Sequence, residues 1–200
     1  MDDGFKVKLA AIAIFAVVLA IGIESGAEFF TFQRIKANAM VEERELLPTG
    51  EDDHGELRTA FNLPGVTAPE FTTVSSAGLG PKTPVVGIEI DGEAVAFPLS
   101  QLEDPHIVNA MIGGKALSVT FCTLVNCVRV LTDESQSQPL DLRLGGQDSN
   151  MQMVFMYNGS RYAQESKEIP LVDFPYKRCS LAEWQAKYPK TKIFVAPNET

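Results

Sequence analysis

The sequence predicts an α+β protein, in which a single N-terminal transmembrane helix is followed by an antiparallel β-rich globular domain with a short C-terminal helix. Three observations predict this. An uninterrupted run of 15 apolar residues occupies positions 9–23. Further along, apolar segments of strand length are separated by Asp-Gly, Gly-Gly and Asn-Gly pairs, which favour tight hairpin turns. Near the end, Ser180-Leu181-Ala182-Glu183 has the pattern that begins a capped helix.

The apolar run predicts a membrane anchor. Its 15 residues would rise about 22 Å as a helix, less than the roughly 30 Å hydrocarbon core of a bilayer. The helix can continue, because Phe29, Phe30 and Phe32 follow the run. The residues assigned to the anchor include Leu9, Ile12, Phe15, Leu19 and Ile23.

The flanking charges predict the orientation of this anchor. Lys6 and Lys8 precede the run, so the positive-inside rule keeps the N-terminus in the cytoplasm. We therefore expect a single-pass protein of the bacterial inner membrane whose main domain is periplasmic or otherwise extracytoplasmic. A cleaved signal peptide is the alternative, since the small residues Ser25 and Ala27 suit cleavage before Glu28.

Three regions are predicted along the chain. Residues 1–47 form the anchor helix and a stalk, because residues 33–47 have helix-forming composition and Pro48 ends it. Residues 48–84 form an extended connector, in which proline and glycine recur without clear periodicity. A stretch of this length is usually disordered or laid across a partner's surface, and we favour the second. Residues 85–200 form the β-rich domain.

Each element of the domain follows from a local signal. Asp91-Gly92 joins the first two predicted strands, because this pair readily adopts the positive φ angles of a type I′ turn. Further hairpins are predicted at Gly113-Gly114 and Asn158-Gly159, and another between residues 127–132 and 139–144. The helix that begins after Ser180 ends before Pro189, and residues 191–196 form the last strand.

Charge and motifs exclude several function classes. Lys and Arg number 17 against 26 Asp and Glu, giving a net charge of −9. An acidic surface repels nucleic-acid phosphates and anionic lipid headgroups, whereas it would suit a basic protein partner. The sequence has no glycine-rich phosphate loop, no G-x-S-x-G elbow, no H-E-x-x-H and no C-x-x-C-H motif. We therefore predict no enzyme activity.

Two of the three cysteines flank a predicted hairpin turn. Cys122 and Cys127 enclose Thr-Leu-Val-Asn between two apparent strands. Directly opposed residues in an antiparallel pair have Cα atoms about 4.5–5.5 Å apart, which is within disulfide range. A disulfide, two buried free thiols, and a metal or cofactor site are all compatible with this spacing. The third cysteine, Cys179, precedes the capping box.

His106 stands at the head of another predicted strand. With Cys122, Cys127 and one methionine it would make a nitrogen and sulfur site suited to copper or another transition metal. Candidate methionines occur at positions 151, 153 and 156. The alternatives are that His106 is a hydrogen-bonded structural residue and that the methionines are core residues.

Several short motifs occur in a characteristic order. They are Asp91-Gly92, Phe97-Pro98, His106-Ile107-Val108-Asn109, Ile112-Gly113-Gly114, Val119-Thr120-Phe121-Cys122, Cys127-Val128-Arg129-Val130, Phe174-Pro175 and Glu183-Trp184. Over about residues 84–196 this series resembles the bacterial domain-of-unknown-function family 3179. The resemblance implies no agreed activity, but members pair a histidine in an H-x-V-N-like motif with two cysteines. The matching positions here are His106, Cys122 and Cys127.

The chain departs from the family pattern in three places. Four residues separate its cysteines, as in another branch of the family, whereas many members have closely spaced ones. Tyr188 stands where a histidine often precedes the last proline, and Gly145-Gly146-Gln147 replaces a Gly-Gly-Trp-like segment. A family active site, if there is one, would be incomplete in this chain.

Two functions are consistent with these features. The first is a non-catalytic accessory subunit whose helix packs in the membrane against the subunits of a larger complex, such as a respiratory or photosynthetic one, with the β domain over its extracytoplasmic face. The second is a membrane-tethered metal-binding or redox protein that uses His106, Cys122 and Cys127.

Overall fold

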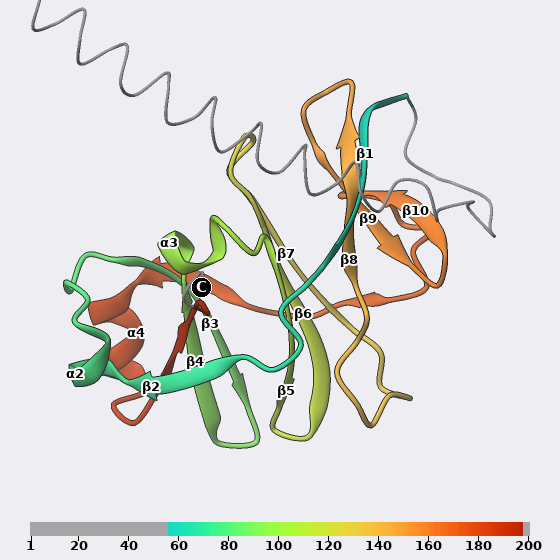
Figure 1. Cartoon of the computed structure of the whole chain (residues 1–200). Coiled ribbons are helices and arrows are strands. Elements are labelled where there is room, and N and C mark those ends of the chain that lie inside the picture. The colour runs from blue at the N-terminus through green and yellow to red at the C-terminus, as the bar shows by residue number, and fades with distance from the viewer. Residues whose placement is uncertain (1–55, 198–200) are drawn as a thin grey trace, which may run out of the picture. The chain divides into compact units, whose positions relative to one another are not determined.

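The computed structural model describes residues 56–197 of the chain. The predicted anchor, the stalk and the first part of the connector lie outside these residues. Within residues 56–197, no helix is both long enough and apolar enough to cross a membrane. The prediction of an antiparallel β-rich domain with a short C-terminal helix is confirmed (Figure 1).

The described strands form three sheets. Sheet A has the order β1 (Leu57–Pro64), β8 (Arg143–Asp148), β9 (Met153–Tyr157), β10 (Ser160–Ala163). Sheet B has the order β11 (Val172–Asp173), β7 (Cys127–Thr132), β6 (Lys115–Cys122), β5 (Ile107–Ile112). Sheet C has the order β12 (Lys177–Ser180), β3 (Pro84–Ile90), β4 (Glu93–Pro98), β13 (Lys192–Val195), β2 (Glu70–Thr73).

Turn chemistry explains the hairpins. Asp91 and Gly92, between β3 and β4, have φ values of 51° and 88°. The pairs between β5 and β6 and between β9 and β10 also have positive φ at both positions, so these three predicted hairpins are confirmed. The hairpin predicted from residues 127–132 and 139–144 is wrong, because β7 pairs with β6 and β11, whereas β8 pairs with β1 and β9.

The described part of the predicted connector contains strands and a short helix, which the sequence did not predict. From Leu57 onward it carries β1, β2 and the short helix α2 (Val74–Ala77). β1 pairs with β8, and β2 pairs with β13, so this stretch forms one edge of sheet A and one edge of sheet C. The residues between β1 and β2 also run beside β5 at the edge of sheet B, where Val66 forms a parallel bridge with Val108.

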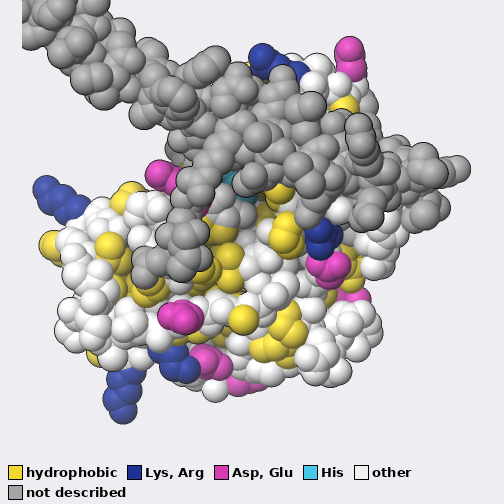
Figure 2. Space-filling view, in the orientation of Figure 1, with side chains coloured by type: hydrophobic (Ala, Val, Ile, Leu, Met, Phe, Trp, Pro, Cys, Tyr) yellow, Lys and Arg dark blue, Asp and Glu magenta, His cyan; other side chains and the backbone are white. Residues whose placement is uncertain are grey.

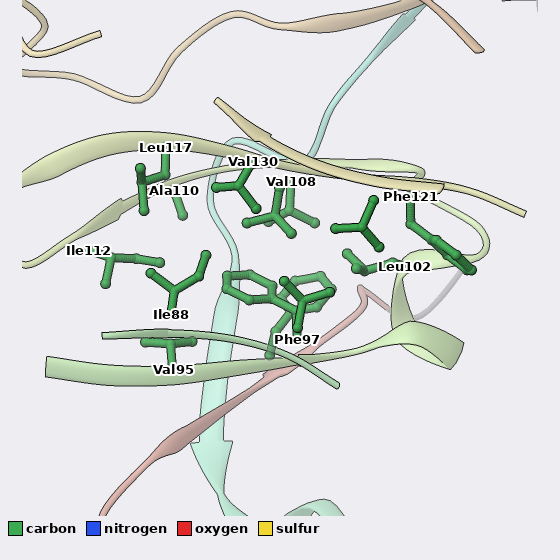
Figure 3. Packing of buried hydrophobic residues seen from close by; sticks show 14 of the residues in the cluster. Ile88, Val95, Phe97, Leu102, Val108, Ala110, Ile112, Leu117, Phe121 and Val130 are labelled. Carbon is green, nitrogen blue, oxygen red and sulfur yellow. The ribbon is translucent and has the colours of Figure 1, made fainter. Parts of the chain in front are cut away.

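The main core lies between sheets B and C (Figure 3). Its buried side chains include Ile88, Val95 and Phe97 from sheet C, and Val108, Ala110, Leu117, Phe121 and Val130 from sheet B. Leu99 and Leu102 of helix α3 (Leu99–Leu102) join them. Because strand side chains alternate between faces, the intervening residues of each sheet meet a different layer.

A second cluster covers the other face of sheet C. Helix α4 (Leu181–Lys187) places Leu181 and Trp184 against Val85, Ala96 and Ile193. The predicted capping box is confirmed: the Ser180 hydroxyl accepts a hydrogen bond from the Glu183 backbone N–H, and the Glu183 carboxylate accepts one from the Ser180 N–H.

Candidate functional site

The two cysteines lie opposite one another at the mouth of the β6–β7 hairpin. The register pairs Cys122 directly with Cys127, as the sequence predicted. Both are free thiols in the structure, as is Cys179. Cys122 is 5% exposed, whereas Cys127 is only partly buried.

The surroundings of the two thiols differ. The Cys122 Sγ lies 3.9 Å from the carbonyl oxygen of Met151, in the turn between β8 and β9. Burial raises the pKa of the Cys127 thiol, and the nearby Glu165 and Cys122 raise it further. Arg129 and Arg178 act in the opposite direction without reversing the shift. The Cys127 thiolate is therefore disfavoured at neutral pH.

His106 is held beside the same strand by a backbone contact. Its φ is 56°, and its Nδ1 lies 3.2 Å from the carbonyl oxygen of Phe121, the residue before Cys122. A carbonyl oxygen only accepts, so Nδ1 carries the proton and Nε2 has the lone pair in the neutral ring. Burial lowers the pKa of His106, although the Phe121 hydrogen bond, Asp104 and Glu103 oppose this shift. The folded protein therefore favours a neutral imidazole.

Acidification from about pH 7 to about pH 5 is expected to destabilise the wild-type protein more than His106→Gln. As the pH falls through about 6.5, an unfolded histidine takes up a proton before the buried one does. Neutral His106 thus contributes to the free energy of unfolding above about pH 6.5. This contribution is lost as the pH falls from about 6.5 toward the lowered pKa of His106 in the folded protein. Urea unfolding across this pH range measures the effect. The same loss of stability with falling pH in both proteins would contradict this prediction. His54 is present in both, so it does not affect the comparison.

The structure brings the predicted metal-site residues only partly together. Cys122 faces Cys127, and His106 bonds to the backbone next to Cys122. Among residues 56–197, however, no group of three or more His, Cys, Asp and Glu side chains is placed to hold a metal ion. A surface hollow of about 550 Å³ is lined by residues from 132–135 and 170–175. Another, of about 290 Å³, is lined by residues from 92–94 and 187–191. Neither lining includes His106, Cys122 or Cys127.

The candidate methionines separate into two kinds. Met153 and Met156 are buried in β9, where they are core residues. Met151 is 39% exposed in the β8–β9 turn, and its Sδ accepts a hydrogen bond of 2.8 Å from Arg58 Nη1. Of the three candidate methionines, Met151 is the one that contacts a cysteine in the described structure, and it does so through its backbone carbonyl rather than its sulfur.

Sequence reasoning missed a buried polar centre at Asn109. Its Oδ1 accepts a hydrogen bond from the Ser118 hydroxyl, and its Nδ2 donates to the Leu142 carbonyl at 3.0 Å. Its backbone N–H donates to the Val66 carbonyl. Asn109 therefore ties the β1–β2 link and the segment before β8 to sheet B. The available signal was an asparagine inside an otherwise apolar strand.

A second missed centre is Arg129 in β7, which is 8% exposed. Its Nη1 donates to the carbonyl oxygens of Gln164 and Ser166, at 2.8 and 2.9 Å. Its Nε donates to Asp173 at 2.6 Å, and this contact lowers the pKa of that carboxyl. The guanidinium thus fastens the segment after β10 onto sheet B.

The turn of the β6–β7 hairpin exposes apolar side chains. Leu124 is 60% exposed and Val125 39%. Near this turn, the backbone carbonyl of Met151 lies against the Cys122 Sγ at the end of β6, and the Tyr176 hydroxyl donates a hydrogen bond to the Val128 carbonyl in β7. We call these four exposed residues, Leu124, Val125, Met151 and Tyr176, the tip patch.

Arginines border the tip patch. Arg178 Nη1 donates to the Asn126 carbonyl at 3.0 Å, and Arg58 donates to Met151. Exposed apolar side chains that gather at one place commonly mark an interaction surface, and Tyr, Met and Arg are enriched in protein interfaces. The arrangement is suited to contact with another protein.

Comparison with known proteins agrees with the resemblance in the motifs. No curated protein and no solved structure matches the chain. The profile of the family described as "Protein of unknown function (DUF3179)" matches residues 62–200, which include β2 to β13 and most of the predicted motifs. The chain therefore belongs to the DUF3179 family.

Proposed function

We propose that the chain is a membrane-anchored, non-catalytic accessory subunit of a larger membrane protein complex. The N-terminal apolar run anchors it in the bacterial inner membrane, and the β domain packs on the extracytoplasmic side of the complex. A respiratory or photosynthetic complex is a natural host, with integral membrane subunits as the partners. The observation that carries the proposal is the tip patch.

The tip patch supports a protein partner rather than a charged ligand. A two-strand turn usually carries polar residues, glycine or proline, yet this one places Leu124 and Val125 in solvent. On the face shown in Figure 2, apolar side chains gather over the middle of the described surface, and acidic and basic side chains lie around them, some directly beside one another. Apolar contact at the tip, bordered by Arg58 and Arg178, therefore supplies the binding surface.

Replacing both Leu124 and Val125 with serine is expected to release the protein from its complex. Losing two central apolar contacts costs roughly 2 kcal/mol, or about thirtyfold in affinity. Blue-native electrophoresis after mild detergent extraction measures this: the wild type migrates with the complex and the double variant alone.

The matched control for this prediction is Val172→Ser. Val172 is 65% exposed but pairs with Thr132, at the end of β7 away from Cys127. This variant is expected to remain with the complex. A wild-type chain that migrates alone would contradict the proposed function, and equal migration of both variants would contradict the role of the tip patch.

The second candidate function is a membrane-tethered metal-binding or redox protein. The observation that favours it is the direct pairing of Cys122 with Cys127, next to the Phe121 carbonyl that holds His106. Two thiolates and the Nε2 of His106 are ligands that copper and other transition metals accept. Metal analysis of the purified chain tests it: stoichiometric metal, lost in His106→Ala and retained in Cys179→Ser, would support this function over the first.

A further inference from the structure

The two thiols at the hairpin mouth already have a backbone placement that permits a bond between them. Directly opposed residues of an antiparallel pair lie on the same face, with Cα atoms about 4.5–5.5 Å apart. This separation is within the range of a disulfide. The Cys122–Cys127 register meets this condition in the free-thiol state.

The third cysteine is not part of this arrangement. Cys179 lies in β12 of sheet C, opposite Val85, and packs against the cluster that contains Leu181 and Trp184. Cys122 and Cys127 belong to sheet B. Each of these two is therefore the nearest possible intramolecular partner of the other.

The pair is also asymmetric in access. Cys122 is 5% exposed and lies under the Met151 carbonyl, whereas Cys127 is only partly buried. A reagent from solvent meets Cys127 first. Cys122 is then placed to attack the Cys127 sulfur from within the protein.

The remaining soft ligand in this region is already engaged. The Met151 Sδ accepts a hydrogen bond from Arg58. Within the described part of the chain, no third His, Cys, Asp or Glu side chain is placed to complete a metal site with the two cysteines. The geometry therefore favours a bond between the two sulfurs.

We propose that Cys122 and Cys127 are a thiol–disulfide exchange pair that reacts with a low-molecular-weight disulfide, with Cys127 as the attacking thiol and Cys122 as the resolving thiol. Because burial raises the pKa of Cys127, its thiolate forms mainly in alkaline buffer. This thiolate attacks one sulfur of the external disulfide, forms a mixed disulfide and releases one thiolate. The Cys122 thiolate then attacks the Cys127 sulfur, forms the internal disulfide and releases the second thiolate. The protein pair loses two electrons and two protons, and the external disulfide becomes two thiols.

Oxidation closes the hairpin whose turn carries Leu124 and Val125. The internal bond joins the two strands immediately before and after that turn, so it restricts the turn in the folded and unfolded chain. The chemistry does not depend on the accessory-subunit function, because it requires no protein partner. Any effect on binding through the tip patch does rest on that function.

The test is a redox titration of the purified full-length chain with oxidised and reduced glutathione. Samples are quenched in acid and alkylated, and the alkylated cysteines are identified by mass spectrometry. We expect Cys122 and Cys127 to lose alkylation together as the buffer becomes oxidising, whereas Cys179 remains alkylated. The oxidised form is expected to have a melting temperature about 5 °C higher than the reduced form.

Single variants separate the two roles. Cys122→Ser is expected to accumulate a glutathione mixed disulfide on Cys127, because the resolving thiol is absent. Cys127→Ser is expected to form the adduct on Cys122 at least tenfold more slowly, because Cys122 is buried. Cys179→Ser is expected to titrate like the wild type.

Three outcomes would overturn the inference. The first is that Cys122 and Cys127 stay alkylated in fully oxidised buffer. The second is an adduct that forms equally fast in the Cys122→Ser and Cys127→Ser variants. The third is stoichiometric metal that remains bound to the pair through purification. Failure of blue-native co-migration would contradict the accessory-subunit function and leave these three readouts unaffected.

Discussion

Replacing Gly87 with alanine is expected to destabilise the domain by about 3 kcal/mol, a large part of the stability of a typical domain. A Cβ atom at Gly87 would lie 2.4–2.6 Å from three ring atoms of Trp184. Gly87 belongs to β3, inside sheet C, where it pairs with Lys177 of β12 and Ala96 of β4. The backbone has neighbours on both sides and cannot retreat from the ring.

The indole ring is equally restrained. Its Nε1 donates a hydrogen bond of 2.9 Å to the Thr191 hydroxyl, and the ring centroid lies 4.3 Å from that of Tyr188. Moving Trp184 to accept a methyl group would break the hydrogen bond or displace α4. The added methyl group therefore meets two surfaces that are both fixed.

Urea unfolding followed by tryptophan fluorescence measures this effect, because Trp184 is the single tryptophan of the chain. The matched control is Gly80→Ala, since a Cβ at Gly80 has nothing within 4 Å. That variant is expected to stay within about 0.5 kcal/mol of the wild type. Equal stability of the two variants would show that sheet C and α4 separate more easily than their packing indicates.

Replacing Arg129 with methionine is expected to cost about 3 kcal/mol of unfolding free energy. The Gln164 and Ser166 carbonyl oxygens, which accept hydrogen bonds from its Nη1, are buried, and methionine has no donor to replace these bonds. Asp173 would also lose the contact that contributes most to its lowered pKa. Arg129→Lys is expected to lose most of this stability too, because one ammonium cannot reproduce the guanidinium fork.

Lys167→Met is the control for Arg129. Lys167 binds the same carboxylate, Asp173, at 3.2 Å, but its side chain is 79% exposed. A surface pair of this kind contributes little, so we expect a change below about 0.5 kcal/mol. The comparison by chemical denaturation separates loss of the buried donors from loss of a positive charge near Asp173. Comparable losses in the two variants would contradict the role assigned to the buried fork.

Local chemistry made part of the fold predictable. Asp91-Gly92, Gly113-Gly114 and Asn158-Gly159 each determine a turn and therefore the pairing of the strands beside it. The capping box at Ser180 depends on two residues that are three positions apart, so it was predictable in the same way. The opposition of Cys122 and Cys127 followed in the same way from a short loop between two apolar strands.

Non-local pairing was not predictable from these signals. The pairing of β1 with β8 joins residues that are far apart in sequence, and nothing in the turn chemistry of either strand specifies it. For the same reason, the sequence predicted a connector before residue 84, whereas the described part of this stretch supplies an edge strand to each of two sheets. Asn109 and Arg129 bind carbonyl groups of segments that are distant in sequence. Their polar side chains could therefore be noticed within apolar strands, but their hydrogen-bond partners could not be predicted. Leu124 and Val125 in a turn were the one readable sign of the tip patch.

The position of β13 in sheet C has a consequence for biosynthesis. This strand lies between β4, to which it is parallel, and β2, to which it is antiparallel. It is the last described strand to leave the ribosome, yet it occupies an interior place in the sheet. Until residues 192–195 join the sheet, β2 and the edge of β4 that faces away from β3 have no strand partner, so assembly depends on protecting these open edges from aggregation.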